Sequence, residues 1–211
     1  LPRGSAGGGA PGDAGVRDNL ALESLALTPD GRTLCTASES ALAQDGDLAT
    51  LERGTRVRLW CHAVDGAGPG LQVLLTIEPI ARRPLLPGLP ATNGLTELLA
   101  LGDGRFIALE RSFSAGATTP GQPSTGVTAR LFLVDIRGAT DVSAMTSTQG
   151  ADVVPARKRL LLDLSTLRHD DGTPLAVDNL EGLAWGPSFE GRRTLILVSD
   201  DNFSSRQFTQ F

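Results

Sequence analysis

The 211-residue chain is 40% hydrophobic and 20% charged, a composition typical of a folded globular protein with a sizeable core. Its formal net charge of −5 argues against nucleic acid and anionic membranes as partners, because both bind basic surfaces, and it favours cationic ligands such as metal ions. No apolar stretch approaches the roughly 20 residues that a membrane-spanning helix requires, so we expect no membrane insertion.

The chain opens with a Gly-rich segment. We expect residues 1–17 to form a flexible lead-in and residues 18–211 to form the folded portion. A second segment rich in Gly, Ser, Thr and Pro, residues 114–128, predicts a mobile loop.

The folded portion repeats one phrase three times, at residues 19–39, 93–113 and 179–203. Each copy opens with Asn and, within four residues, Glu. A short apolar run, an acid-Gly-Arg turn, a second apolar run and another acid follow. The opening glutamates are about 74 and 84 residues apart, and repeats at such intervals indicate a stacked or circular array of supersecondary units.

Each copy predicts a β-hairpin, because Asp-Gly or Glu-Gly lies between two apolar runs and Gly accepts the positive φ of a tight turn. Two further strands follow each of the first two hairpins. The expected strands are 22–27, 33–38, 56–62 and 71–78, then 95–101, 106–110, 131–136 and 159–164, and finally 180–185 and 194–199. The run of leucines at 160–162 fits either a strand or part of a buried helix.

Four antiparallel strands per unit predict an all-β fold built from β-propeller blades. The sequence holds about two and a half such units, whereas propellers close on themselves with four or more blades. We therefore expect an incomplete propeller, with the missing blades supplied by the same gene product.

The two cysteines, Cys35 and Cys61, lie in the second and third strands of the first unit, which should be antiparallel neighbours. We predict that their side chains are close enough for a disulfide, provided that the register of the two strands places them on the same face. One pair of cysteines does not by itself fix the redox compartment.

The carboxylates that bracket the hairpins are the main candidates for chemistry. If the first strand of each unit is the innermost, Glu23, Glu97 and Glu181 lie at equivalent heights around a central channel, where their charges repel unless a cation binds them. Oxygen ligands favour Ca²⁺, and Mg²⁺ less strongly, over zinc. The alternative is that each Glu accepts hydrogen bonds from backbone donors of the neighbouring unit.

The closing carboxylates Glu39, Glu110 and Asp200 are candidates for a general base, and Arg111 is a candidate phosphate ligand that would otherwise pair with a carboxylate. Other catalytic patterns are not supported. The segment at 168–174 only superficially resembles a histidine phosphatase signature, and the sequence has no zinc-ligand spacing and no G-x-S-x-G nucleophile motif.

These same stretches, especially LERSFS at 109–114 and NLEGLA at 179–184, resemble the phytase-like β-propeller family described by the phrase "esterase-like activity of phytase". The resemblance extends over nearly the whole chain and corresponds to the C-terminal part of the family fold. It implies a bacterial protein that is secreted or periplasmic, and it implies hydrolysis of phosphate esters or related esters, but it supplies no catalytic residues.

The leading hypothesis is an exported propeller that binds a divalent cation and hydrolyses the ester of a phosphorylated small molecule. The metal would polarise a phosphoryl oxygen and lower the pKa of a bound water, while a free carboxylate accepts the proton. The alternative is a non-catalytic binding propeller, because the sequence contains no complete catalytic constellation and a fold does not fix a function.

Overall fold

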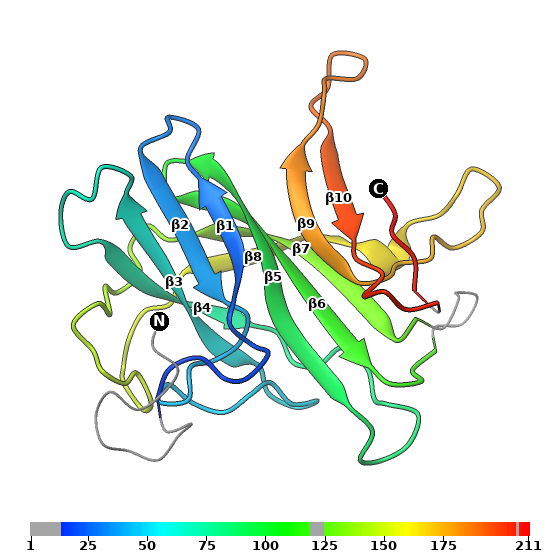
Figure 1. Cartoon of the computed structure of the whole chain (residues 1–211), viewed down its shortest axis with the longest axis horizontal. Helices are drawn as coiled ribbons and strands as arrows, with labels where there is room; N and C mark the ends of the chain where they lie inside the picture. Colours follow the sequence, from blue (N-terminus) through cyan, green and yellow to red (C-terminus); the bar gives the residue numbers. More distant parts are fainter. Residues whose placement is uncertain (1–13, 119–124, 206) are drawn as a thin grey trace.

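The computed structural model describes residues 14–118, 125–205 and 207–211. In this part of the chain the strands form two four-stranded antiparallel sheets and a two-stranded ribbon, and the helical content is one 3₁₀ turn, η1 (Leu164–Thr166). The prediction of an all-β fold with antiparallel four-stranded units is therefore confirmed. The described sheets do not form a closed ring (Figure 1).

The strands follow one another as simple meanders. The first sheet contains β1 (Leu22–Leu27), β2 (Thr33–Ser38), β3 (Thr55–Ala63) and β4 (Leu71–Ile77). The second contains β5 (Ala91–Gly102), β6 (Arg105–Ser114), β7 (Val127–Asp135) and β8 (Arg157–Asp163), and the ribbon pairs β9 (Leu180–Trp185) with β10 (Leu195–Ser199). The expected strands all occur, and those of the second unit are mostly longer than predicted.

The hairpin turns have the geometry that their sequences predict. Asp103 and Gly104 between β5 and β6 have φ of 51° and 67°, and Glu190 and Gly191 between β9 and β10 have φ of 49° and 73°. Two consecutive positive φ angles define the type I′ turn, whose twist matches that of the flanking strands.

The second sheet lies between the first sheet and the ribbon, so both faces of its inner strands β6 and β7 are mostly buried. Along β6, Phe106 and Ala108 belong to the core shared with the first sheet, whereas Ile107 and Leu109 belong to the core shared with the ribbon. The first strands of successive units lie side by side, β1 next to β5 and β5 next to β9 (Figure 1). This arrangement brings the three sequence repeats together.

The leucine run at 160–162 forms part of strand β8, which settles the strand-or-helix ambiguity in favour of a strand. Leu160 and Leu161 are 47% and 43% exposed, because β8 is an outer strand of its sheet. No helix in the described residues is long and apolar enough to span a membrane.

The expected lead-in at 1–17 and the expected loop at 114–128 lie partly outside the described residues. At the described end of the lead-in, the Gly15 amide donates to the side chain of Gln44, and the Arg17 guanidinium donates to the carbonyls of Ala41 and Gly46. These bonds hold residues 15–17 against the segment that follows β2.

Cys35 and Cys61 form a disulfide, as predicted. The two residues are direct partners in the register of β2 and β3, and their Cα atoms are 4.1 Å apart. Both side chains are buried in the core between the first two sheets. The bond closes a loop with a sequence separation of 26 residues and so restricts the unfolded chain.

We expect removal of this disulfide to lower stability by about 2–4 kcal/mol, which corresponds to a fall in melting temperature of roughly 5–15 °C. The measurement is a thermal melt of the protein with and without reductant. The Cys35→Ala/Cys61→Ala variant is the control and should melt at one temperature in both conditions. Free thiols detected in the unreduced, unfolded protein would contradict the assignment.

Candidate functional site

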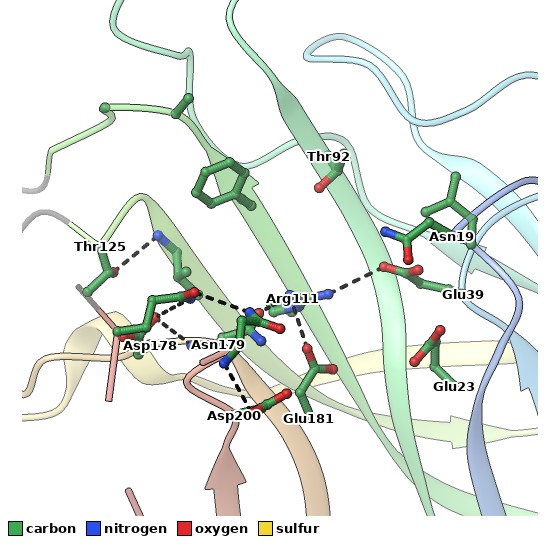
Figure 2. Close-up of a pocket in the computed structure, with 17 residues that line it drawn as sticks. Asn19, Glu23, Glu39, Thr92, Arg111, Thr125, Asp178, Asn179, Glu181 and Asp200 are labelled. Atoms are coloured by element: carbon green, nitrogen blue, oxygen red, sulfur yellow. Dashed lines mark hydrogen bonds and ion pairs between the residues drawn. The ribbon is translucent and has the colours of Figure 1, made fainter. Parts of the chain in front are cut away.

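A polar pocket of about 950 Å³ opens where the first strands of the three units begin. Acidic and amide side chains from the first and third repeats line it, together with Arg111 from the second (Figure 2). The lining includes Asn19, Glu23, Glu39, Thr92, Arg111, Thr125, Asp178, Asn179, Glu181, Asp200, Asn202 and Gln207. The pocket therefore contains Glu23, Glu39, Arg111, Glu181 and Asp200 of the predicted site.

A β-bulge in the first strand of each unit positions these side chains. The register of each opening hairpin shifts by one residue, and the extra residue is Glu23 in β1, Thr96 in β5 and Glu181 in β9. A bulge leaves its extra residue unpaired and increases the local twist, and bulges are frequent beside functional sites.

The bulges also define which residues of the partner strands are equivalent. The leucine just before each bulge pairs with one residue of the partner strand, namely Ser38, Glu110 or Ser199. The residues that come next in sequence, Glu39, Arg111 and Asp200, therefore occupy equivalent positions. All three of these next residues line the pocket. The middle unit thus places a guanidinium where its two neighbours place carboxylates.

Arg111 is the centre of the polar network in the pocket. Its Nη2 atom lies 3.5 Å from Glu39 Oε1 of the first unit, and its Nη1 atom lies 3.2 Å from Glu181 Oε1 of the third unit. Nη1 also donates to Asn179 Oδ1 (Figure 2). One side chain therefore links carboxylates from both neighbouring units.

Glu39 is held tightly against β5. Its carbonyl accepts the amide of Leu95 at 2.9 Å, and its side chain lies across Gly94. A Cβ atom at position 94 would come within 2.5 Å of Glu39 Cγ, so glycine is required for this approach. The Gly of the second repeat thus makes room for the carboxylate of the first.

The environment of the pocket makes two carboxyl groups easier to protonate. Burial raises the pKa of Glu39 to about 7; Arg111 opposes this shift, whereas Glu23 and Glu181 add to it. Burial also raises the pKa of Glu181, again opposed by Arg111 and increased by Glu23 and Asp200. Glu39 can therefore exchange a proton near neutral pH, as a general acid or base must.

Glu97 does not join the other two opening glutamates. It lies one residue beyond the bulge of β5, and a shift of one residue turns a side chain to the opposite face of a strand. Its Oε1 accepts the backbone amides of Leu98 at 2.8 Å and of Leu25 in β1 at 3.3 Å. The expected equivalence of Glu23, Glu97 and Glu181 is therefore not found, and Glu97 bonds backbone donors instead.

Glu110 is also outside the pocket, because it precedes Arg111 and points to the other face of β6. Its carboxylate is 2% exposed and lies between the first two sheets, where it pairs with Lys158 and accepts the amides of Glu78 and of the Asn93 side chain. Burial raises the pKa of Glu110, and Lys158 opposes the shift. This arrangement is a buried structural network rather than part of the candidate site.

Asn179, which no sequence pattern marks as a site residue, is 3% exposed and contacts Arg111. The available signal was the Asn that opens each repeat. That signal was ambiguous, because Asn19, Asn93 and Asn179 stand three, two and one residue before the leucine at which the bulge begins. They are therefore not structurally equivalent.

The donor chemistry of the pocket suits a hard divalent cation, because Glu23, Glu181 and Asp200 supply only oxygen ligands and repel one another. Within the described residues, no group of three or more His, Cys, Asp or Glu side chains is already arranged to hold a metal ion.

A family model named Phytase-like, with the description "Esterase-like activity of phytase", matches residues 3–203 of the chain. Comparisons with curated proteins and with solved structures gave no match.

The placement of Glu97 generates a stability prediction. We expect Glu97→Ala to lower stability by roughly 1–2 kcal/mol, with or without calcium, because the Leu25 and Leu98 amides lose their acceptor. The measurement is a urea or thermal unfolding curve. Glu23→Ala is the matched control and should change stability little in chelator, since Glu23 is exposed in the pocket. Equal losses for both variants would contradict the structural role of Glu97.

Proposed function

Because the chain belongs to the phytase-like family, we propose that it is a hydrolase of phosphate esters and that the polar pocket is its active site. The observation that carries this proposal is the pairing of Glu39 with Arg111. A buried carboxyl group whose pKa is about 7 lies beside a guanidinium in an open pocket, which combines a proton acceptor with an anion ligand.

In the proposed mechanism, ionised Glu39 takes a proton from a water molecule, and the water oxygen attacks the phosphorus atom. The bond between phosphorus and the ester oxygen breaks, and the departing alcohol oxygen takes a proton from solvent. The positive charge of Arg111 stabilises the negative charge that develops on the phosphoryl oxygens. Asp200, at the position equivalent to Glu39, is the second candidate for the base.

We also propose that the pocket binds a divalent cation, Ca²⁺ rather than Mg²⁺, through Glu23 and Glu181 with Asp200. When bound, such an ion supplies positive charge for a phosphoryl oxygen and lowers the pKa of a coordinated water. Support for this proposal comes from the mutual repulsion of the carboxylates, which contributes to the raised pKa of Glu181.

The two sheets and the ribbon are proposed to be β-propeller blades, with β1, β5 and β9 as the innermost strands. Their side-by-side packing and the position of the pocket at their ends support this proposal, because propellers carry their first strands around a central channel. We propose export to the periplasm or the exterior, which agrees with the disulfide, since disulfides persist in oxidising compartments.

We expect Glu39→Gln to lower kcat/KM for a phosphate ester roughly a hundredfold or more, because glutamine cannot accept the proton. Without a bound cation, the wild-type rate should rise as pH increases through about 7, since Glu39 must be ionised to act as a base. The measurement is a pH profile of hydrolysis of a generic phosphate ester. Glu97→Gln, the same change outside the pocket, is the control and should keep the wild-type profile.

If the wild-type protein hydrolyses no phosphate ester with or without divalent cations, the proposal of an enzyme is wrong. The binding propeller then becomes the better account of the pocket.

The cation proposal predicts that calcium raises the melting temperature of the wild-type protein relative to chelator, because a ligand of the folded state stabilises it. Glu181→Gln should lose most of this shift, whereas Glu97→Gln should retain it. Thermal melts of the three proteins in calcium and in chelator test both points. Identical wild-type melts in the two conditions would exclude the cation.

A further inference from the structure

Two buried nitrogen atoms in the pocket make no hydrogen bond of normal distance and angle with the described residues. They are Nε of Arg111 and Nδ2 of Asn179. Buried polar atoms in folded proteins nearly always have partners, so each exception needs an explanation. The other two buried side-chain atoms without a partner, in Ser38 and Thr148, are hydroxyl oxygens that do not line this pocket.

The orientation of the Asn179 amide is fixed by its neighbour. The Arg111 guanidinium can only donate hydrogen bonds, so the amide atom that faces Nη1 must be the oxygen, Oδ1. The Nδ2 group must therefore point elsewhere. It makes no hydrogen bond of normal geometry, although one of its two hydrogens faces the Glu181 carboxylate as a poorly aligned donor that lowers the pKa of Glu181.

The backbone of Asn179 is held on both sides. Its amide donates to the carboxylate of Asp178, and its carbonyl accepts the amide of Asp200 at 2.9 Å. Asp178 is itself 1% exposed and accepts hydrogen bonds from the side chain of Gln207 and the amide of Phe208. Asn179 is thus a rigidly mounted, 97%-buried side chain at the wall of the pocket, which is how binding sites hold their polar groups.

Both unpartnered groups are donors, and one belongs to a cation. A ligand that satisfies them must present an acceptor, and a negatively charged oxygen is the strongest acceptor for a guanidinium. We propose that Arg111 Nε and Asn179 Nδ2 together bind an oxygen of the phosphate group of the substrate. This inference rests on the proposed function, and it makes Asn179 a binding residue of the site.

The surrounding carboxylates would repel such an anion, and Glu39 competes directly because it pairs with Arg111. The charged groups that face Glu39 are Arg111, Glu23 and Glu181. Loss of the Glu39 charge therefore releases Arg111 and removes one repulsive group at the same time. Phosphate binding should be stronger when Glu39 is neutral.

The test is an isothermal calorimetric titration of the full chain with inorganic phosphate at one fixed pH. Asn179→Asp keeps the oxygen that accepts from Arg111 but removes the Nδ2 donor, and we expect phosphate affinity to fall roughly tenfold to a hundredfold. Arg111→Lys keeps the charge but removes Nε, and a fall of similar size is expected. Melting temperatures of both variants check that each is folded.

Asn202→Asp is the charge-matched control, because Asn202 is an exposed residue of the same pocket. It should weaken phosphate binding clearly less than Asn179→Asp. Equal affinities of wild type and folded Asn179→Asp, or equal losses in Asn179→Asp and Asn202→Asp, would overturn the assignment of Asn179. Failure of the wild-type protein to bind phosphate would overturn the site as a whole.

Glu39→Gln separates this inference from the proposed function. It should lower hydrolysis roughly a hundredfold or more and yet bind phosphate as tightly as wild type or more tightly, because its neutral side chain no longer competes for Arg111. Weaker phosphate binding in Glu39→Gln would contradict the competition and with it the site. Retained hydrolysis together with intact phosphate binding would overturn Glu39 as the base and leave the phosphate site standing.

Discussion

The arrangement of the pocket depends on three first strands, β1, β5 and β9, that pack side by side and each carry a β-bulge at an equivalent position. Each of these bulges sits near the same end of its hairpin, so Glu39, Arg111 and Asp200 on the partner side reach one region of space. If the bulges were removed, the alternation of side chains would continue unbroken and would carry a different set of residues to the pocket. The pocket is thus a property of the repeat, and its chemistry comes from what each copy places there.

The copies differ at one decisive point. The outer units place Glu39 and Asp200 at the position where the middle unit places Arg111. A carboxylate in all three units would concentrate negative charge with no internal compensation. Arginine in the middle unit reaches Glu39 on one side and Glu181 on the other, so a single guanidinium serves both neighbours. Its planar fork of donors suits this role better than a lysine ammonium.

Much of the fold could be predicted from the sequence, because the signals were local. Asp-Gly between apolar runs located the hairpins, strict alternation located the further strands, and the positions of Cys35 and Cys61 indicated the disulfide. The site was predicted only in part. Glu97 and Glu110 belong to the repeated phrase, yet a shift of one residue relative to the bulge sends them into structural contacts.

Composition and periodicity do not reveal where a strand gains an extra residue. The opening asparagines stand at different distances from the three bulges, so aligning the copies by their letters misaligns them in space. The contribution of Asn179 depends on a still finer feature, the direction of its amide, which follows from a contact with Arg111, 68 residues away in sequence. Such a contact is decided by packing between units, and no local pattern encodes it.

An acidic pocket that is proposed to bind a phosphate must reduce its own negative charge, and the structure offers two ways of doing so. One is protonation of Glu39, which burial and the repulsion of Glu23 and Glu181 already favour. The other is a divalent cation among the carboxylates, which would favour their ionised forms and so lower the pKa of Glu39. The two ways oppose each other, since a proton on Glu39 weakens cation binding and a bound cation expels the proton. Glu39 must be ionised to act as a base, and the phosphate must still be able to approach the pocket. A bound cation offsets the negative charge of the pocket without protonating Glu39, and so leaves Glu39 able to act. On this argument, cation binding should be accompanied by release of protons from the pocket.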